Sequence, residues 1–356
     1  MRIAILGAGF AGLAVTWHIL RYSRGRYTID LYDPQEIGTG SSGNSLGLLH
    51  PYPGKRAMRA WRATRSITEA HRLFTEASQA IGKPVVTGRG VLRPAVTEKN
   101  VEEFQYRVKQ WQDIEWWDHN KCAREIPGLV THPTGGGMFI PEGLTIDVKI
   151  YLEGLFKACV NLGTIYKQTT DISGSVLQSY DRVLVALGAN SLAFGPLKQL
   201  PMTPIKGQIL SLKWPKNVPP PKYALAGEKQ LVMDPGYESC SVGATYERDF
   251  TSLAINEELA YKEIMPKILE FFPLLKGAEI VGVRTGVRAC PAGMYPFVGK
   301  LSKNLWFMTG LGSKGLLYHA WLGKAMARAI LKDDTSFLPT EALCQVQVTD
   351  DTKSKK

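Results

Sequence analysis

Cysteine is scarce and scattered in this chain. The five cysteines, Cys122, Cys159, Cys240, Cys290 and Cys344, lie far apart, and none belongs to a C-x-x-C pair. Zinc clusters and the disulfide frameworks of small secreted domains both need closely spaced cysteines, so neither is expected. An odd number of cysteines also fits a reducing compartment. We therefore expect no metal site and no structural disulfide.

Long hydrophobic runs are also missing. No window of the 356 residues approaches the roughly 18 consecutive apolar residues of a membrane span. The first buried strand is expected at residues 2–6, which leaves no space for a secretory leader before it. The sequence shows neither internal repeats nor a low-complexity linker, and its length allows two domains or one two-lobed unit. These observations predict a soluble, cytoplasmic protein without a membrane partner.

Positive charge, by contrast, is in excess. Lysine and arginine total 43 residues against 32 aspartates and glutamates, a formal net charge of +11. This excess suits a polyanionic partner such as nucleic acid, although a general solubility role fits equally well. In an expected helix over residues 56–81, Arg56, Arg59, Arg62 and Arg65 recur every third residue and form a basic stripe. The stripe either contacts phosphates or is a solvated helix face.

The first 33 residues carry the most specific motif. An apolar strand at residues 2–6 leads into GAGFAG at residues 7–12, a helical stretch follows, and a second strand ends on Asp33. This order is the dinucleotide-binding βαβ fingerprint in its expected context. Gly7 allows the tight turn, Gly9 lets the backbone approach a pyrophosphate, and Gly12 lets the helix pack closely. The motif predicts a dinucleotide, NAD or FAD, against the alternative of a glycine turn without a ligand.

Three later segments also place small residues at the edge of a strand or helix. Residues 38–47 form a small-residue loop, an apolar strand at residues 182–187 ends at Gly188, and a strand at residues 305–309 leads through the turn 310–315 into a helix. In open α/β sheets such strand ends present backbone to a cofactor. Residues 202–286 differ from these segments, because their pattern predicts antiparallel strands interrupted by one helix.

Five motifs in this order resemble the D-amino-acid-oxidase-like family of FAD-dependent amine oxidases, which includes glycine and sarcosine oxidases. They are the GxGxxG at residues 7–12, the loop 41–47, the strand end 186–191, the segment 286–299 and the glycine turn 310–315. The resemblance spans nearly the whole chain. It implies an FAD-dependent oxidoreductase that acts on CH–NH or CH–NH2 groups. The FAD is expected to be non-covalent, because Cys290 lacks the local pattern of a covalent flavin attachment.

Within that family, the sequence particularly resembles the oxidase half of the bifunctional proteins of tRNA 5-methylaminomethyl-2-thiouridine biosynthesis. The likeness rests on the loop 40–51, on PIKGQ at residues 204–208, on GATY at 243–246 and on GSKGL at 312–316. His50 departs from the pattern, because the loop usually has an aromatic residue there, and CPAG replaces a TPD run. A methyltransferase half has no counterpart, so at most one of the two reactions is expected. The resemblance implies tRNA as a partner.

The expected fold is therefore α/β, with a Rossmann-like FAD-binding domain interleaved with an antiparallel-sheet α+β substrate domain. The FAD-binding domain is expected to be discontinuous and to comprise residues 1–83, 143–203 and 287–342. The substrate domain then comprises residues 84–142 and 204–286, and residues 343–356 form a polar tail.

The resemblance also implies which residues meet substrate and cofactor. Arg288 lies eleven residues before Gly299, where the family places an arginine that holds a substrate carboxylate through paired hydrogen bonds, the alternative being a structural salt bridge. Tyr246 is a second candidate for the catalytic site, with Tyr295 as a further pocket hydroxyl, and either is otherwise a core residue. No histidine is nominated as a base. The expected FAD-binding residues are Gly7, Gly9, Phe10, Ala11, Gly12, Asp33, Ser41, Ser42, Gly43, Asn44, Gly47, Leu48, Gly188, Gly312, Ser313, Lys314, Gly315 and Leu316.

Three functions fit these residues. The first is oxidative cleavage of a secondary-amine C–N bond in the carboxymethylaminomethyl group of the tRNA wobble uridine. The second keeps this chemistry but acts on a free small amine or amino acid, such as glycine, sarcosine or a D-amino acid. The third is a flavin-containing RNA-binding protein without turnover.

Overall fold

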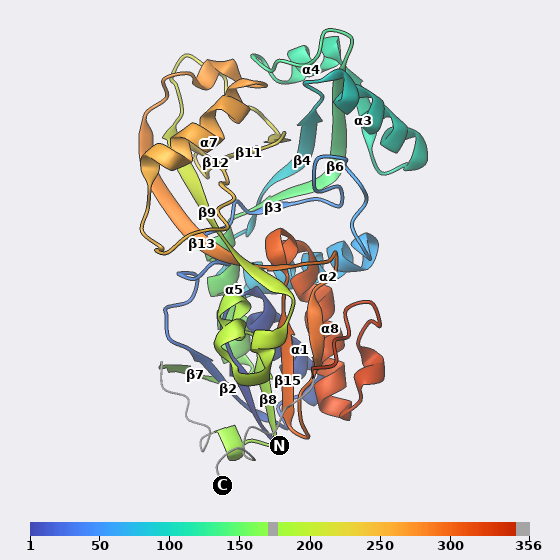
Figure 1. Ribbon diagram of the computed structural model, residues 1–356, viewed down its shortest axis with the longest axis vertical. Coiled ribbons are helices and arrows are strands. Elements are labelled where there is room, and N and C mark those ends of the chain that lie inside the picture. The colour runs from blue at the N-terminus through green and yellow to red at the C-terminus, as the bar shows by residue number, and fades with distance from the viewer. Residues whose placement is uncertain (170–176, 347–356) are drawn as a thin grey trace.

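The computed structural model describes residues 1–169 and 177–346, and the strands in these residues form two sheets. Figure 1 shows one sheet in the lower lobe and the other in the upper lobe, along the long axis of the molecule. The long strands β9 (Met202–Lys213) and β13 (Ile280–Pro291) reach from the upper lobe to the junction. The expected α/β class with a Rossmann-like unit is confirmed.

The lower sheet carries the βαβ motif. Its strand order is β14-β15-β8-β1-β2-β7, and all its pairs are parallel except β14 with β15. Because β1 lies between β2 and β8, Ile3 pairs with Ile29 on one side and with Arg182 on the other. The carboxyl ends of parallel strands meet at one edge, so the turns after β1, β8 and β15 lie together there. The strands are β1 (Arg2–Leu6), β2 (Thr28–Asp33), β7 (Thr164–Gln168), β8 (Arg182–Val185), β14 (Phe297–Lys300) and β15 (Leu305–Thr309).

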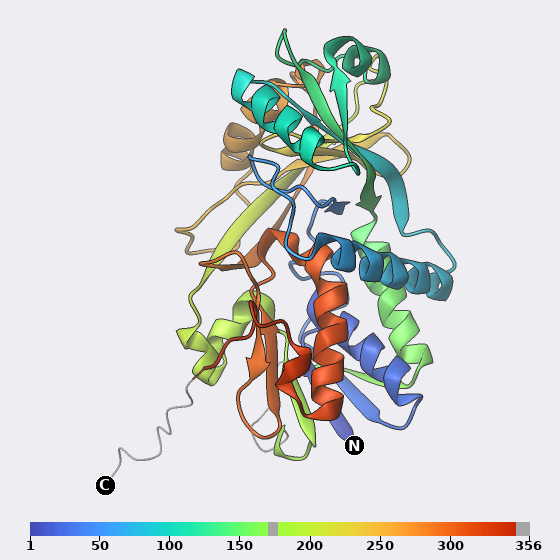
Figure 2. The ribbon, with the colours of Figure 1, turned by 90° about the vertical axis from the view of Figure 1, so that its right-hand side faces the viewer.

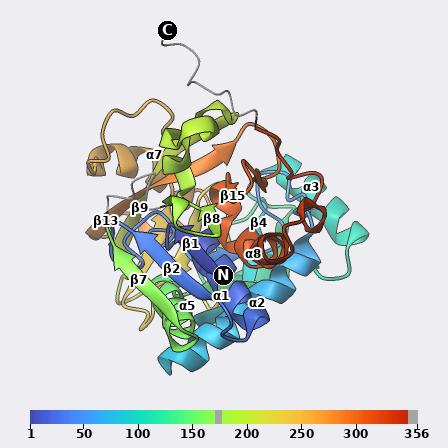
Figure 3. The ribbon, with the colours of Figure 1, turned by 90° about the horizontal axis from the view of Figure 1, so that it is seen from below.

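Helices α1 (Phe10–Ser23), α5 (Val148–Asn161) and α8 (Gly315–Lys332) pack against one face of the lower sheet, as Figures 2 and 3 show. Helix α2 (Ala63–Ile81) packs across α5 and α8. Their apolar faces and the sheet form one core, in which Ile5, Leu13 and Leu152 are fully buried. α1 and α8 cross closely, since a Cβ placed on Gly323 would lie 2.8 Å from that of Ala14. The other face carries the short 3-10 segments η1 (Gly188–Ala193) and η2 (Gly195–Gln199).

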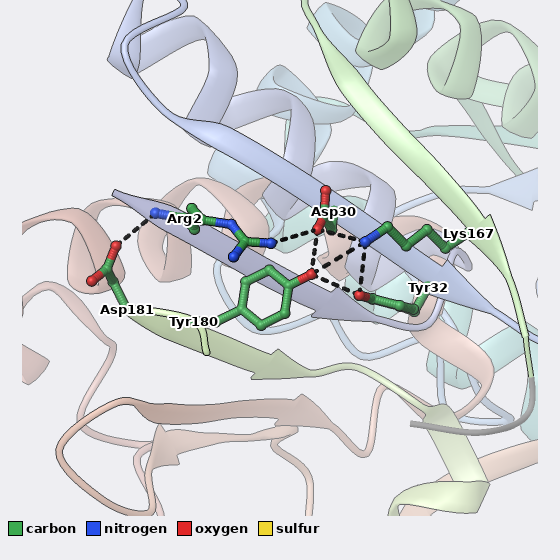
Figure 4. Close-up of polar contacts among 6 residues, drawn as sticks. All are labelled: Arg2, Asp30, Tyr32, Lys167, Tyr180 and Asp181. Atoms are coloured by element: carbon green, nitrogen blue, oxygen red, sulfur yellow. Dashed lines mark hydrogen bonds and ion pairs between the residues drawn. The ribbon is translucent and has the colours of Figure 1, made fainter. Parts of the chain in front are cut away.

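A buried polar cluster lies on this second face of the lower sheet (Figure 4). Asp30 of β2 is only 2% exposed. Its carboxylate accepts hydrogen bonds from Lys167 Nζ at 2.9 Å and from the Tyr180 hydroxyl, and Arg2 Nη2 lies 3.6 Å away. The Tyr32 hydroxyl is 2.6 Å from that of Tyr180. Burial raises the pKa of Asp30, but these hydrogen bonds and charges outweigh burial and leave the pKa below its usual value.

The upper sheet is mainly antiparallel. Its order is β13-β9-β12-β11-β10-β4-β6-β3, with β5 beside β6, and β10 with β4 is a parallel pair. Helix α7 packs through Ile264 and Ile268 against Leu210 and Leu212 of β9. The remaining strands of this sheet are β3 (Leu48–Leu49), β4 (Val86–Pro94), β5 (Glu115–Asp118), β6 (Gly136–Ile146), β10 (Ala224–Ala226), β11 (Gln230–Met233) and β12 (Ser239–Gly243); its helices are α3 (Glu98–Gln110), α4 (His119–Glu125) and α7 (Glu257–Leu269).

The expected helix over residues 56–81 is wrong at its start. Helix α2 begins at Ala63, and Arg62 before it has a left-handed backbone with φ of 50°. The preceding segment is a turn held by a hydrogen bond from Ala60 N to Pro51 O (2.7 Å). Of the four arginines in the proposed basic stripe, only Arg65 therefore lies in the helix.

Asp147 caps α5, because its Oδ1 accepts a hydrogen bond from Ile150 N at 3.1 Å. Cys344 N donates to Val298 O of β14 at 2.9 Å, so the chain follows the lower sheet beyond residue 342. The rest of the expected tail, residues 347–356, falls outside the described residues. Among the helices described, none is both long and apolar enough to cross a membrane.

Candidate active site

The turn between β1 and α1 has the steric features of a pyrophosphate-binding loop. Gly7 has φ of +102°, and a Cβ there would overlap the carbonyl oxygen of Ala186 at the end of β8. A Cβ on Gly12 would overlap the carbonyl oxygen of Gly7. The amides of Ala11 and Gly12 lie in the first turn of α1, where N–H groups have no partner within the helix. These free donors, at the positive end of the helix dipole, suit a phosphate.

Two side chains hold this glycine loop in place. Asp33 Oδ2, at the end of β2, accepts a hydrogen bond from Ala8 N at 2.7 Å. Ser42 Oγ accepts one from Phe10 N at 3.1 Å. A Cβ on Gly9 would lie 2.8 Å from the same Ser42 oxygen. The glycine loop is therefore packed directly against the small-residue loop of residues 38–47.

This small-residue loop connects the two lobes. A Cβ on Gly43 would overlap Gly38 O, and a Cβ on Gly47 would overlap Ile146 O next to α5, so both positions need glycine. While Ser42 contacts the start of α1, Ser41 Oγ accepts a hydrogen bond from Val287 N of β13 at 2.9 Å. Two adjacent serines thus join the nucleotide motif to the strand that carries Arg288. Asn44 Nδ2 donates to Thr39 O within the loop (3.0 Å), and Leu48 opens β3.

The glycine turn after β15 contacts both of these regions. Gly310 and Gly312 have φ of +74° and +55°, and η4 (Gly312–Lys314) leads directly into α8. A Cβ on Gly315 would lie 3.4 Å from Phe10, and one on Gly312 would lie 3.7 Å from the sulfur of Cys290 on β13. Desolvation lowers the pKa of Lys314. Ser313 and Leu316 belong to the same turn and first helical residues. The Gly188 carbonyl accepts a hydrogen bond from Thr309 Oγ1 at 2.8 Å, which joins the ends of β8 and β15.

Arg288 lies on β13 between Val287, which donates to Ser41, and Cys290, which lies near Gly312. Both terminal nitrogens of its guanidinium are 3.4 Å from Thr245 O. A Cβ on Gly207 of β9 would overlap the guanidinium, so glycine at this position leaves the space that the Arg288 side chain occupies. Within the described residues no carboxylate forms an ion pair with Arg288, so the salt-bridge alternative has no partner there. Loss of hydration lowers the pKa of Arg288 below its usual value.

A buried ion pair supports the Thr245 carbonyl and has no signal in the sequence. Lys206 of β9 is 4% exposed, and its Nζ lies 3.4 Å from Glu247 Oε2. Glu247 Oε1 accepts hydrogen bonds from Thr245 Oγ1 at 2.6 Å and Gln208 Nε2 at 3.0 Å. Burial raises the pKa of Glu247, but these hydrogen bonds and the charge of Lys206 outweigh burial and lower it overall. A lysine in a strand is usually solvated, so the sequence pattern alone does not predict this pair.

The other aromatic and histidine candidates differ in their surroundings. Tyr246 follows Thr245 and is 52% exposed, with the Arg248 guanidinium 5.5 Å from its ring centre. Tyr295 packs edge-on against Trp61, with 5.1 Å between ring centres. Desolvation and the charge of Arg93 lower the pKa of His50 to about 3, so this histidine is neutral at physiological pH. Of these residues, only Tyr246 is next to Thr245, whose carbonyl contacts the Arg288 guanidinium.

The site thus combines a dinucleotide loop with two further glycine turns and a desolvated arginine beyond them. The chain belongs to the FAD dependent oxidoreductase family, whose family model matches residues 2–329. It is an oxidoreductase, and its cofactor is FAD. The residues present fit this cofactor, since the turn between β1 and α1 combines sterically required glycines with backbone N–H groups that have no partner within the helix.

Comparison with individual proteins narrows the relationship. The bifunctional tRNA 5-methylaminomethyl-2-thiouridine biosynthesis protein MnmC of Maricaulis maris is 27% identical over 92% of this chain and 52% of its own length. The chain therefore spans about half the length of this relative. Glycine oxidase from Geobacillus kaustophilus has a similar fold, with a TM-score of 0.78, 18% identity and coverage of 94% and 95% of the two chains. Iminodiacetate oxidase from Chelativorans sp. gives a TM-score of 0.76 at 19% identity, with coverage of 96% and 98%.

Proposed function

We propose that this protein oxidises a secondary amine that carries a carboxymethyl group, and that its substrate is the carboxymethylaminomethyl group of the wobble uridine in tRNA. The reaction yields an aminomethyl group on the uridine and free glyoxylate. In this proposal the lower lobe binds FAD without a covalent bond, along the glycine loops described above. The β9–β13 side of the upper lobe binds the substrate.

The observation that carries the proposal is Arg288 without a counter-ion. A desolvated guanidinium that hydrogen-bonds only weakly, to one carbonyl, leaves most of its donors available. A carboxylate matches these donors through two parallel hydrogen bonds. Ser41 and Gly312 contact β13 on either side of Arg288. In this proposal, a carboxylate held by Arg288 therefore lies beside the flavin ring of the cofactor.

The chemistry follows from this placement. FAD, when bound, accepts the hydride and its two electrons. Arg288 holds the carboxylate and so orients the adjacent CH2 group, whose C–H bond breaks as a C=N bond forms to the substrate nitrogen. Water then adds to the C=N carbon, and C–N cleavage releases glyoxylate and leaves the amine on the uridine. With FAD bound along the turn 310–315, Lys314 and the N-terminus of α8 would supply positive charge that stabilises the reduced flavin.

Two observations favour tRNA as the carrier of this group. The relative in Maricaulis maris is named for the biosynthesis of a modified tRNA uridine. The chain also carries a net charge of +11, which suits a polyanionic substrate. A tRNA substrate in turn implies that the enzyme works in the cytoplasm.

A free small amine is the second candidate. The similar structures include enzymes named for glycine and for iminodiacetate, and iminodiacetate itself is a secondary amine with carboxymethyl groups. Arg288 would hold the carboxylate of either kind of substrate. The two candidates therefore share the chemistry and differ in whether RNA is recognised.

Anaerobic flavin reduction separates them. The purified flavoprotein is mixed without oxygen with carboxymethylaminomethyl-bearing tRNA, glycine, sarcosine or iminodiacetate, and the visible flavin bands are followed. We expect rapid bleaching by the modified tRNA at micromolar concentration and no bleaching by unmodified tRNA. Bleaching by a free amine but not by the modified tRNA would replace the first candidate with the second.

A further inference from the structure

A basic cavity lies where the turn before α2 meets the end of α3. Its volume is about 360 Å³, and it is lined by Arg59, Arg62, Arg65 and Trp111, together with Thr64 and two alanines. This volume is within the range of small-ligand sites. Figures 1 and 2 show α2 running across the junction between the two lobes. Part of its lining, Arg59 to Arg62, belongs to the segment that the sequence pattern misassigned to a helix, and Arg65 lies in the first turn of α2.

The three arginines differ in how they are paired. Arg59 Nη2 lies 3.1 Å from Asp113 Oδ2, and its guanidinium lies 4.3 Å from the Trp111 ring centre, so this side chain is fixed. Arg62 Nη2 is 2.8 Å from Glu341 Oε1. Arg65 is exposed and has no hydrogen-bond or ion-pair partner among the described residues. Two carboxylates thus face three guanidinium groups, and one positive charge is left for a ligand.

Trp111 adds an aromatic surface to this charge. Trp111 follows the last residue of α3 and is 36% exposed, so part of its side chain is accessible. An exposed tryptophan beside unpaired arginine is the combination that binds single-stranded nucleic acids, because the ring stacks on a base while the cation contacts the phosphate. A double-stranded helix offers no unstacked base to such a ring.

Aromatic contacts connect the cavity to the flavin side of the active site. Trp61, in the same turn as Arg59 and Arg62, has its ring centre 5.8 Å from that of Tyr318 and 5.1 Å from that of Tyr295. Lys314 Nζ lies 5.9 Å from the Tyr318 ring centre. Trp61 and Tyr318 thus link the turn that carries Arg59 and Arg62 to Lys314 of the glycine turn 310–315.

We propose that this cavity binds an unpaired nucleotide close to the modified uridine, with its phosphate on Arg65 and its base on Trp111. The inference rests on the proposed function, because it supplies the RNA contact which that function needs. It names single-stranded RNA of the anticodon loop as the ligand. The active site alone recognises the small carboxymethyl group, whereas this cavity recognises the RNA that carries it.

Binding can be tested separately from catalysis. The FAD-loaded protein is titrated into a fluorescently labelled, unmodified anticodon stem-loop RNA, and anisotropy is followed at several salt concentrations. Trp111→Leu should weaken binding roughly 5- to 100-fold, the usual range for one stacked base. Arg65→Ala should weaken binding by about tenfold and reduce the slope of log affinity against log salt by about 1. Trp111→Phe, which keeps a stacking ring, should recover most of the loss.

Matched controls remove the same groups elsewhere. Arg124→Ala deletes an arginine whose side chain is 69% exposed on α4, and Tyr261→Leu deletes an aromatic ring that is 43% exposed on α7. Both variants should change RNA affinity less than about twofold. For Arg124→Ala this is because general surface charge is screened. A fully paired RNA hairpin stem should bind Trp111→Leu and the parent protein equally.

The outcomes separate this inference from the proposed function. If Trp111→Leu and Arg65→Ala bind the stem-loop as tightly as the parent protein, or if the parent protein binds no RNA, the cavity is not the RNA site. Bleaching of the flavin by modified tRNA would still support the proposed function in the first case. If binding depends on both residues but modified tRNA does not bleach the flavin, the cavity assignment stands and the proposed function fails.

Discussion

Two charged side chains, Asp30 and Arg288, are removed from water in opposite ways. Asp30, on the lower sheet, is surrounded by Lys167, Tyr180 and Arg2, and its pKa falls despite burial (Figure 4). Arg288, on the upper sheet, is desolvated beside a single carbonyl, and its pKa falls because desolvation outweighs the nearby groups, such as Glu247, that raise it. For an acid a lowered pKa means a stabilised charge, and for a base it means a destabilised charge.

Whether a desolvated charge has partners within the protein distinguishes a structural charge from one that binds a ligand. The partners of Asp30 come from β1, β7 and the residues before β8, so the cluster fastens neighbouring strands. The environment of Arg288 carries a desolvation cost that a bound carboxylate would offset. We therefore expect substitutions at Asp30 to lower stability, and substitutions at Arg288 to lower activity.

The largest effect is expected for Arg288→Ala. The rate constant for flavin reduction divided by the substrate dissociation constant should fall roughly 10²- to 10⁴-fold, as for loss of about 3–5 kcal/mol of a desolvated charge pair. The free energy of unfolding should be unchanged or slightly higher. Stopped-flow absorbance and urea unfolding measure the two quantities. Arg288→Lys, which keeps the charge but not the fork of donors, should lie between. An Arg288→Ala protein that unfolds more easily but reacts normally would make Arg288 a structural residue.

The opposite result is expected for Asp30→Asn. Its free energy of unfolding should fall by about 2–3 kcal/mol, because the Lys167 and Tyr180 donors lose a charged acceptor. The rate of flavin reduction should not change. The control is Asp181→Asn in the same cluster, whose carboxylate accepts an exposed hydrogen bond from Arg2 N at 2.7 Å. This control should cost less than about 1 kcal/mol. Equal losses for both variants would show that burial of Asp30 contributes nothing.

Glu247→Gln tests a charge that contributes both to stability and to the substrate site. The ion pair with Lys206 is buried, and Glu247 also positions Thr245, whose carbonyl contacts Arg288. We expect a loss of about 1–3 kcal/mol in unfolding free energy. We also expect a roughly threefold to tenfold loss in substrate affinity, equivalent to about 0.7–1.4 kcal/mol. Denaturant unfolding and substrate titration of flavin reduction measure these changes. A change in stability without one in affinity would separate the ion pair from the site.

The smallest effect is the acid dependence of the Asp30 cluster. Because the folded pKa of Asp30 lies below its ordinary value of 3.8, the unfolded chain binds the proton more readily. The contribution of Asp30 is therefore complete above about pH 5 and is lost as the pH falls toward the folded pKa. The difference in unfolding free energy between the parent protein and Asp30→Asn should shrink steadily from pH 5 to pH 3. A constant difference over this range would mean that ionisation of Asp30 does not contribute.

The residues whose roles depend on local sterics were predictable from the sequence. Gly7 and Gly12 occupy positions where a Cβ would overlap backbone atoms. A spaced glycine motif directly indicates positions where no Cβ can be accommodated. The strand at residues 305–309 was also predicted, because apolar runs that end in glycine are a local signal.

Features that depend on distant partners were not predictable. The turn before α2 is held by Asp113 and Glu341, far from Arg59 and Arg62 in the sequence, and these contacts override a helical pattern of arginines. The burial of Lys206 likewise depends on Glu247 across the sheet. Arg288 was identified only because its spacing from Gly299 resembles a family pattern. No local property distinguishes it from other strand arginines.

The strand order of the lower sheet also bears on how the protein is made. Because β1 pairs with β8, one edge of β1 stays uncovered during synthesis until Arg182, the partner of Ile3, has left the ribosome. At typical translation rates of 5–20 residues per second this interval is roughly ten to forty seconds. During it the N-terminal strand has an open edge that invites chaperone binding or misassociation. Gly315 reaches its place beside Phe10 later still, so the glycine turn after β15 joins the βαβ motif only after that edge is covered.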